Sequence, residues 1–322
     1  MPPLAPPRVL LLTDPAMAAH VAPGHDERPE RLEAASLGVA DGAAAGGAEL
    51  DRPRVEPADD LALRLVHPAW YLESLDAAAA RGGGWLDADT YLGPQSMVAA
   101  RLAAGATLQG ALAVARGEAS VAFAVVRPPG HHAAAERAAG FCLINNVAVA
   151  VAALREVGLA QRVAVIDWDV HHGDGTQALS DADAELCYAS THQSPLYPGT
   201  GDASERGIGA AAGTKHNVPL PPGSDDTAFT AAWLERLLPT VEAFRPEAIL
   251  VSAGYDAHRD DPLANLEVTE AGYAAVAEAL GRLTARLGLP GVTLALEGGY
   301  DLAALRASVA ATVTGLAAGL RE

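Results

Sequence analysis

The sequence predicts an α/β protein with a mostly parallel central sheet that is covered by helices on both faces. Short apolar runs rich in β-branched residues alternate with longer stretches rich in Ala, Leu, Glu and Arg. Such alternation is typical of βαβ units. Polar clusters directly follow several of the apolar runs, and ligands bind at the carboxyl ends of the strands in such sheets. We therefore expect a functional site at that edge of the sheet.

Short, apolar and β-branched runs are interpreted as strands, and the longer stretches between them as helices. The predicted strands are 9–12, 120–126, 163–167, 185–190, 248–253 and 292–297. The predicted helices are 30–38, 68–79, 96–114, 145–157, 227–243, 269–287 and 302–320. No internal repeat and no linker divides the chain, so a single domain over residues 1–322 is expected.

Composition limits the classes of function. The chain has 322 residues, is 50% hydrophobic and carries a net charge of -18, which disfavours nucleic-acid binding through a basic surface. Cys142 and Cys187 form no disulfide framework and lack zinc-site spacing, which fits a reducing compartment. Residues 1–7 do not resemble a signal peptide, and no uninterrupted apolar run reaches the about 18 residues of a membrane-spanning helix. The expected location is the cytoplasm, without a membrane partner.

The most informative motif is 167–175, which reads DWDVHHGDG and follows a predicted strand. Alternate residues of an extended chain share a face, so Asp167, Asp169 and His171 should point the same way. Carboxylate oxygens beside an imidazole nitrogen form part of a divalent-metal site. A polar turn is the alternative interpretation, but it leaves several ionisable side chains crowded without purpose. His172 should face the opposite way and brace a neighbouring loop.

Asp256 is the natural third protein ligand, because it follows the strand 248–253 and a glycine. Together with Asp169 and His171 it would match the three protein ligands of a catalytic zinc site. Oxygen-rich ligation also tolerates Fe²⁺ or Co²⁺.

His131 and His132 are adjacent and follow Pro-Pro-Gly. Asp167 and Asp174, which are not needed as ligands, can each orient one imidazole and raise its basicity. Asp–His pairs beside a metal-activated water form a general-base arrangement. Tyr300 follows two glycines and can donate a hydrogen bond to a developing oxyanion. These residues predict metal-assisted hydrolysis.

Together these motifs resemble the zinc-dependent histone deacetylase and acetylpolyamine amidohydrolase family, which has the three-layer arginase-deacetylase fold. The resemblance covers nearly the whole chain and is greatest to bacterial class II-type members. The matching segments are 23–31 (PGHDERPER), 127–132 (RPPGHH), 140–142 (GFC), 167–176, 197–201 (YPGTG), 252–262 and 297–300 (EGGY).

The resemblance implies catalytic roles. His132 would be the general base and then the general acid, oriented by Asp174. His131, paired with Asp167, would be its electrostatic partner. Tyr300 would polarise the amide carbonyl.

The resemblance also implies binding positions. The zinc ligands would be Asp169, His171 and Asp256. A structural K⁺ would be held near Asp167, Asp169, the His171 carbonyl and Ser190. A channel for the acyl-lysine stem would be lined by Gly140, Phe141 and Tyr197, with Leu263 as its gate and Asp89 at its rim.

Two departures from the family pattern bear on the substrate. Asp174 stands where many class II-like members have Asn, and should make the His132 pair more basic. Leu263 stands where polyamine-selective members often carry an acidic gate residue. An apolar gate offers a cationic polyamine tail no partner, which favours acyl-lysine.

The expected function is zinc-dependent removal of acetyl or longer acyl groups from the ε-amine of lysine in proteins or peptides. Deacetylation of acetylpolyamines or other small N-acyl amines is the alternative. A ureohydrolase of the same fold would need a second metal, but no close Asp-x-Asp pair accompanies Asp256. A non-catalytic acyl-lysine binder is disfavoured, because all the implied catalytic residues are present. A homodimer or homotetramer is consistent with the resemblance.

Overall fold

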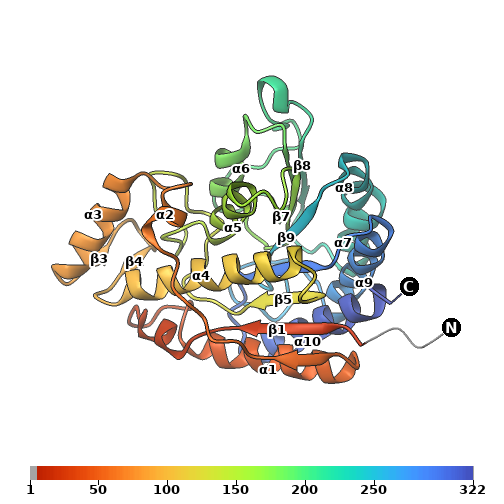
Figure 1. Cartoon of the computed structure of the whole chain (residues 1–322), viewed down its shortest axis with the longest axis horizontal. Helices are drawn as coiled ribbons and strands as arrows, with labels where there is room; N and C mark the ends of the chain where they lie inside the picture. Colours follow the sequence, from red (N-terminus) through yellow and green to blue (C-terminus); the bar gives the residue numbers. More distant parts are fainter. Residues whose placement is uncertain (1–5, 322) are drawn as a thin grey trace.

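The computed structural model describes residues 6–321, and an 8-stranded sheet in the order β2-β1-β5-β10-β9-β6-β7-β8 forms its centre (Figure 1). All neighbouring strands of this sheet are parallel. The strands are β1 (Arg8–Leu12), β2 (Glu49–Asp51), β5 (Val121–Ala124), β6 (Val163–Asp167), β7 (Leu186–Gln193), β8 (Lys215–Leu220), β9 (Ala248–Ala253) and β10 (Val292–Leu296). The predicted fold class is confirmed. The first five residues, which belong to the segment tested for a signal peptide, lie outside the described part.

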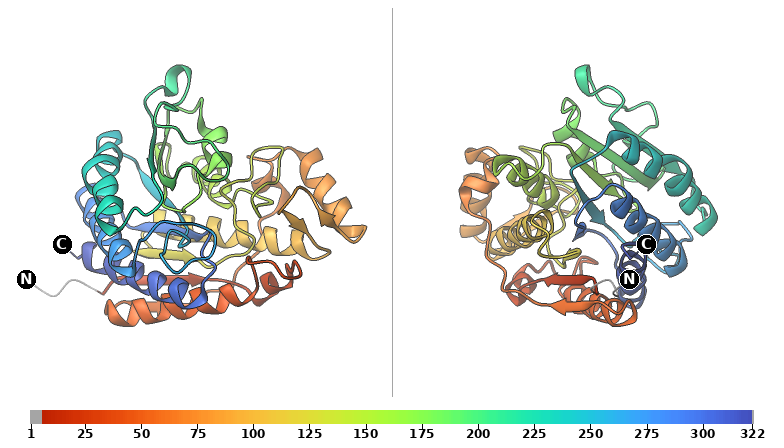
Figure 2. Two further views of the ribbon diagram at one scale, coloured as in Figure 1. Left: turned by 180° about the vertical axis from the view of Figure 1, so that it is seen from behind. Right: turned by 45° about the vertical axis from the view of Figure 1, so that its right-hand side comes forward.

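Helices cover both faces of the sheet (Figure 2). The contacts place α4 and α5 on one face, and α1, α9 and α10 on the other. The helices are α1 (Glu30–Ala45), α2 (Asp60–Leu63), α3 (Ala69–Ala80), α4 (Ser96–Ala115), α5 (Asn146–Glu156), α6 (Asp174–Ser180), α7 (Asp226–Ala231), α8 (Leu238–Phe244), α9 (Glu270–Arg286) and α10 (Leu302–Gly319). Short 3-10 turns η1 (Pro15–Ala19) and η2 (Gly209–Ala211) and a π-helical turn η3 (Ala232–Leu237) complete the helical elements.

The central strands are apolar because the sheet is covered on both faces. Every residue of β5, β6, β7 and β10 is buried. Parallel strands in this position carry continuous apolar runs rather than alternating ones, which is why the sequence predicted them well. The two edge strands, β2 and β8, were not predicted. β2 is only 3 residues long, and β8 contains Lys, His, Asn and Pro.

Further elements differ from the prediction, including α2, which was not predicted. The helix predicted over 227–243 is interrupted by η3. α6 begins at Asp174, where the Gly-Asp-Gly sequence suggested only a turn. A separate antiparallel hairpin joins β3 (Gly84–Trp85) to β4 (Tyr91–Leu92), and it protrudes beside α3 (Figure 1).

α4 and α10 are long and apolar enough to cross a membrane by length and composition alone. In the fold, 72% and 56% of their apolar windows are buried. α4 packs on α5 and the sheet, and α10 packs between α1 and α9. Their hydropathy is therefore explained by their position in the core.

α1 extends beyond Gly38, where the predicted helix ended, because glycines allow it to approach α10 closely. Gly38 and Gly42 lie four residues apart on one face of α1, and Gly46, which caps the end of the helix, continues this spacing. A Cβ added at Gly42 would lie 2.5 Å from the carbonyl oxygen of Ala310. At these positions the absence of a side chain is a packing requirement.

Gly42→Ala should therefore destabilise the protein. Helix propensity alone predicts a gain of about 1 kcal/mol in the free energy of unfolding, whereas overpacking predicts a loss of about 1–3 kcal/mol. Denaturant unfolding of the variant measures the difference. Ala44→Gly, at an exposed position of α1, calibrates the propensity effect. A more stable Gly42→Ala protein would contradict the packing interpretation.

Candidate active site

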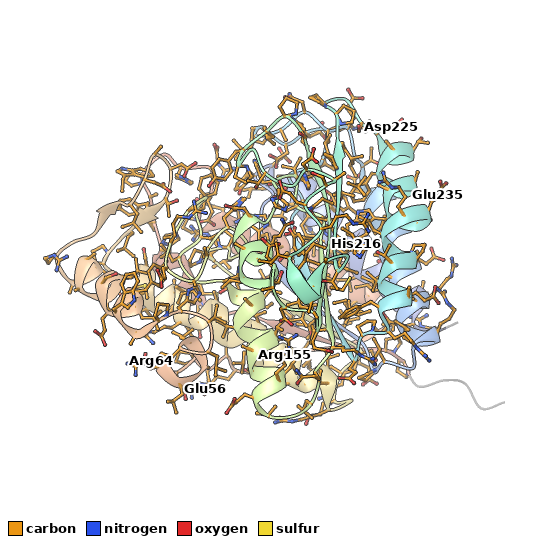
Figure 3. The ribbon with its side chains drawn as sticks, turned by 90° about the horizontal axis from the view of Figure 1, so that it is seen from above. Glu56, Arg64, Arg155, His216, Asp225 and Glu235 are labelled. Carbon is orange, nitrogen blue, oxygen red and sulfur yellow. The ribbon has the colours of Figure 1, made fainter. Side chains whose placement is uncertain are left out.

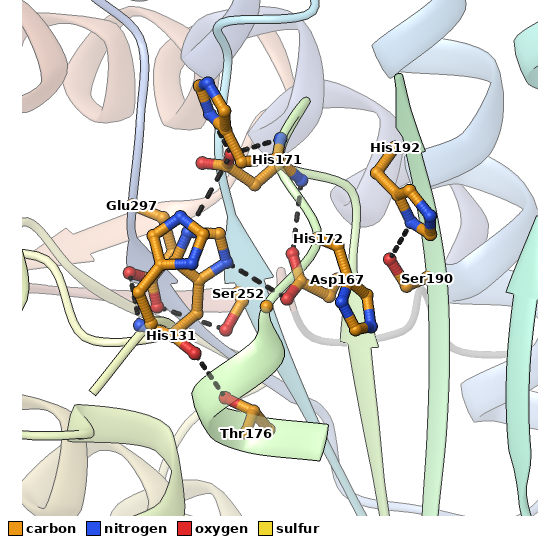
Figure 4. Close-up of polar contacts among 12 residues, drawn as sticks. His131, Asp167, His171, His172, Thr176, Ser190, His192, Ser252 and Glu297 are labelled. Atoms are coloured by element: carbon orange, nitrogen blue, oxygen red, sulfur yellow. Dashed lines mark hydrogen bonds and ion pairs between the residues drawn. The ribbon is translucent and has the colours of Figure 1, made fainter. Parts of the chain in front are cut away.

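The candidate residues meet at one edge of the sheet. β5, β6, β9 and β10 are parallel and adjacent in the sheet, so their carboxyl ends lie at the same edge. The loops after them carry the polar segments 127–132, 168–173, 254–261 and 297–300. Four segments that are far apart in sequence therefore converge on one site. Figure 4 shows His131, His171 and Glu297, from three of these segments, close together.

Asp169, His171 and Asp256 form a cluster whose potential ligand atoms all lie within 4.8 Å of one another. Nδ1 of His171 lies 3.2 Å from Oδ1 of Asp169 and 3.1 Å from Oδ2 of Asp256. Both carboxylates are buried. Two carboxylate oxygens and an imidazole nitrogen are a donor set that suits Zn²⁺ and related divalent metals.

The loop after β6, rather than a continued strand, positions these ligands. β6 ends at Asp167, so the predicted alternation does not extend to Asp169. Instead, the Gly298 N–H donates to Oδ2 of Asp169 at 2.7 Å, and the Val170 N–H donates to Oδ1 of Asp256 at 2.9 Å. A Cβ at Gly298 would overlap both carboxylates. The glycine therefore allows the backbone to approach the cluster.

The cluster favours a bound cation electrostatically. Burial and the charge of Asp169 raise the pKa of Asp256. Burial would lower the pKa of His171, but hydrogen bonds with the two carboxylates raise it to about 10. Two buried carboxylates facing one imidazole leave negative charge that is costly to bury without a cation. The residues therefore fit the metal that the family resemblance implied.

His131 and His132 lie side by side, with ring centroids 4.0 Å apart. Nδ1 of His132 is 2.8 Å from Oδ1 of Asp174, and Nδ1 of His131 is 3.2 Å from Oδ2 of Asp167. Burial would lower the pKa of His131, but Asp169 and Asp167 raise it well above its usual value. Burial and the charge of His131 lower the pKa of His132 to about 3. Neighbouring groups with separated pKa values are typical of acid–base sites.

Arg137 modifies the expected effect of Asp174. Its guanidinium donates to Oδ2 of Asp174 at 2.9 Å, while Oδ1 faces His132. Burial would raise the pKa of Asp174, but His132 and Arg137 hold it below its usual value. Arg137 thus shares the carboxylate charge and opposes the gain in basicity expected from an Asp at this position.

Glu297 supports the histidine pair and was not singled out from the sequence. The buried Oε2 accepts hydrogen bonds from the N–H groups of Gly130 at 2.6 Å and His131 at 3.1 Å. Oε1 accepts one from the Ser252 hydroxyl at 3.1 Å (Figure 4). Glu297 therefore ties the ends of β5, β9 and β10 together. The motif 297–300 contained Glu297 without revealing these contacts.

A buried ion network lies behind Tyr300. The Arg31 guanidinium donates to the carbonyl oxygens of Gly299 at 2.6 Å and of Glu297, and its Cζ lies 4.9 Å from the Tyr300 ring centroid. Glu27 pairs with Arg31 and with a second buried arginine of the 127–132 segment. Burial would raise the pKa of Glu27, but the two arginines lower it to about 2. The sequence motifs contained these residues without revealing what they contact.

His131, His132, His171 and Tyr300 border a cavity of about 250 Å³. Its lining residues are Asp89, Pro129, His131, His132, Gly140, Phe141, His171, Leu196, Tyr197, Leu263, Gly298 and Tyr300. All five residues expected in the channel are among them. A Cβ at Gly140 would overlap the His132 ring, and its φ of +52° favours glycine. Two larger, more open hollows beside α4 and α1 contain none of the candidate residues.

The residues expected near K⁺ have protein partners. Oδ2 of Asp167 accepts a hydrogen bond from the Tyr188 hydroxyl at 2.9 Å. Ser190 pairs with Asp167 in the register of β6 and β7. The Ser190 hydroxyl lies 3.0 Å from Nδ1 of His192 (Figure 4). His172 faces away from the metal cluster and contacts the Thr200 hydroxyl at 2.8 Å, so it braces a neighbouring loop as predicted.

Other histidines have structural surroundings. Nδ1 of His20 lies 2.6 Å from the Ser96 hydroxyl. Nε2 of His67 accepts a hydrogen bond from the Asn145 N–H at 3.0 Å. His216 lies on the edge strand β8 (Figure 3). None of the three lines the cavity.

Comparison with known proteins gives a consistent family. Residues 25–316 match the model of the histone deacetylase domain. The chain is 40% identical over 317 residues to a probable deacetylase of Methanothermobacter thermautotrophicus, with 96% of this chain and 90% of the relative covered. It is 39% identical over 282 residues to the histone deacetylase-like amidohydrolase of Pseudomonas aeruginosa, with 87% and 73% covered.

Solved structures of similar proteins cover almost the whole chain. The HDA15 HD domain superposes with a TM-score of 0.88 at 35% identity, covering 97% of this chain and 90% of that one. The acetylpolyamine aminohydrolase from Burkholderia pseudomallei superposes with a TM-score of 0.85 at 29% identity, covering 97% and 99%.

Mutating a residue outside the ligand shell typically weakens metal binding by about 10- to 100-fold. Asp256→Ala should weaken Zn²⁺ binding by more than this. Calorimetric titration of the metal-free protein measures this. Asp260→Ala, which removes an exposed carboxylate nearby, is the matched control. Equal Zn²⁺ affinity in wild type and Asp256→Ala would exclude Asp256 as a ligand.

Proposed function

Because this chain belongs to the histone deacetylase family of amide-hydrolysing enzymes, we propose that it removes acetyl or longer acyl groups from the ε-amine of lysine in proteins or peptides. One observation carries the proposal. His171 of the metal-type cluster, His132 and Tyr300 line one small cavity, whose wall also includes Phe141 and Leu263. A linear acyl-amine stem suits such a cavity, since its apolar wall would contact methylenes while the polar groups meet the amide.

Asp169, His171 and Asp256 would hold the metal, which we propose to be Zn²⁺, with Fe²⁺ or Co²⁺ as alternatives. When bound, such an ion supplies Lewis-acid chemistry that polarises the acyl carbonyl and makes an attacking water more acidic. The protein contributes the geometry, because backbone N–H groups fix both carboxylates in place.

His132 would move the proton. Asp174 engages its Nδ1, so Nε2 is the nitrogen that accepts the proton of the attacking water and later transfers it to the leaving amine. His131 lies between Asp167 and Asp169, which favour its charged form. Its positive charge would stabilise the negative charge that develops at the carbonyl. The Tyr300 hydroxyl would donate a hydrogen bond to the same oxygen.

The apolar Leu263 supports acyl-lysine as the substrate, because a cationic polyamine tail finds no charged partner there. The alternative is an acetylpolyamine or another small N-acyl amine. The superposition on the acetylpolyamine aminohydrolase from Burkholderia pseudomallei supports that alternative.

We also propose a structural K⁺ near Asp167, Asp169, the His171 carbonyl and Ser190, which is supported by the pairing of Asp167 with Ser190. The net charge of -18 supports the absence of a nucleic-acid partner. A cytoplasmic location, the absence of a membrane partner and a homodimer or homotetramer complete the proposal.

Tyr300→Phe should lower kcat on a fluorogenic acetyl-lysine peptide by about 10²–10³-fold, the loss typical of removing one oxyanion donor. The Zn²⁺ content should not change, because the hydroxyl is not a proposed ligand. Steady-state kinetics on metal-loaded protein measure the effect. Full activity in this variant would exclude Tyr300 as the donor.

Leu263→Glu should shift the substrate preference towards N-acetylputrescine and N-acetylspermidine. The wild type should turn over the acetyl-lysine peptide with a higher kcat/KM than either polyamine, and the new carboxylate should raise kcat/KM for the polyamines. Leu263→Gln adds polarity without charge, so it separates the effect of the negative charge on kcat/KM from the effect of a polar side chain. A wild-type preference for polyamines would contradict the gate argument. Hydrolysis of neither these amides nor lysine peptides with longer acyl groups would contradict the proposed function.

A further inference from the structure

Asp261 lies in the loop after β9, and its side chain is buried, with 7% of the residue exposed. The carboxylate accepts hydrogen bonds from three backbone N–H groups. Oδ1 accepts from Leu263 at 3.1 Å, and Oδ2 accepts from Tyr300 at 2.6 Å and from Asp301 at 3.3 Å. One side chain thus connects the loop after β9 to the loop after β10.

The two connected residues that line the cavity have different proposed tasks. Leu263 belongs to the channel wall, and Tyr300 carries the hydroxyl for the carbonyl oxygen. They come from loops that follow different strands. Their relative position therefore depends on what joins the loops, and the Asp261 carboxylate is a direct connection between their backbones.

The loop before Tyr300 needs such an anchor. Gly298 and Gly299 have no side chains to hold them, and Gly299 has a φ of +115°. Arg31 holds the Gly299 carbonyl from one side, and the Asp301 side chain caps the start of α10 by accepting from the Ala304 N–H at 2.8 Å. Between these two anchors, Asp261 holds the Tyr300 N–H itself.

Only a carboxylate provides acceptors on both sides of this bridge. An amide side chain has the same shape but one accepting oxygen, and its NH₂ group would face a backbone donor. Burying a charged group is costly unless it is hydrogen-bonded, and the three N–H donors offset that cost here. The chemistry of the side chain therefore matches the bridging task.

We propose that Asp261 is a positioning residue, which fixes the Tyr300 hydroxyl relative to the channel wall at Leu263. This inference rests on the proposed function, since the hydroxyl matters through the amide carbonyl that it meets. A displacement of about 1 Å can cost about 10²-fold in rate when a reacting group must be aligned. The loss of the bridge should therefore reduce kcat more than substrate binding.

The test is Asp261→Asn, assayed with the acetyl-lysine peptide on metal-loaded protein. We expect kcat to fall about 10- to 100-fold, with KM changed less than about threefold. Asp59→Asn is the matched control, because Asp59 also accepts a backbone N–H, from Ala62 at the start of α2, but does not line the cavity. It should keep the wild-type kcat. If Asp261→Asn also keeps the wild-type kcat, the proposal is overturned.

A double-mutant cycle shows whether Asp261 acts through Tyr300. In the Tyr300→Phe background the hydroxyl is absent, so Asp261→Asn should lower kcat no further. An equal loss in both backgrounds would overturn the positioning role, because a general structural defect would affect both equally. If Asp261→Asn melts below the assay temperature, Asp261→Ser retains one acceptor oxygen and replaces it in the cycle.

Hydrogen exchange separates a failure of this inference from a failure of the proposed function. The amides of Leu263 and Tyr300 should exchange slowly in the wild type and faster in Asp261→Asn. If the wild type hydrolyses no acyl amide but exchange accelerates at both amides, the bridge is supported and the proposed function fails. If exchange is unchanged at both amides, the bridge is overturned whatever the activity.

Discussion

The burial of Asp169 and Asp256 against the single imidazole of His171 is the constraint on which the rest of the site depends. Two carboxylates in a water-poor environment repel each other and lose their hydration. The protein offsets part of this cost with backbone N–H groups from Val170 and Gly298. A divalent cation would offset the remainder. The site therefore has a reason to bind metal that is independent of any family resemblance.

The same constraint explains the polar network around the cluster. Buried polar groups must be satisfied, and partial satisfaction is costly. Glu297 accepts from two amides and a hydroxyl, and the Glu27–Arg31 pair holds the loop before Tyr300. Glu297 and Arg31 act through backbone groups of the loops. They connect the carboxyl ends of separate strands, and they hold the four loops that follow these strands in one arrangement.

The sequence predicted the centre of the fold better than its edges, for a physical reason. β5, β6 and β10 are buried on both faces, so their apolar runs stand out. β2 and β8 lie at the edges of the sheet. β2 is short and partly exposed. The apolar run of β8 is interrupted by Lys215 and Asn217, whose buried side chains donate to the Leu186 carbonyl oxygen and to Oε1 of Gln177. α6 begins at Asp174, directly after the loop that carries the candidate ligands. It was not predicted, because Gly173 and Gly175 on either side of Asp174 suggested only a turn.

Residues with distinctive chemistry could be chosen from the sequence, and the fold brings them to one cavity. Residues that act through backbone contacts could not be chosen from the sequence. In the sequence, Asp261 is only an Asp before a Pro, and its role becomes visible when the fold places the Tyr300 N–H beside it. The role of Arg137 likewise becomes visible only through its contact with Asp174. Their partners are more than 35 residues away in the chain, so no local pattern could indicate them.

Locating the metal tests directly whether Asp169, His171 and Asp256 form the metal site. A crystal of the Zn²⁺-loaded protein, measured on both sides of the zinc absorption edge, gives an anomalous difference map. We expect one strong peak per chain, bounded by these three residues, that disappears in Asp256→Ala. A strong peak elsewhere, or a second peak of equal height in the same cavity, would contradict this assignment.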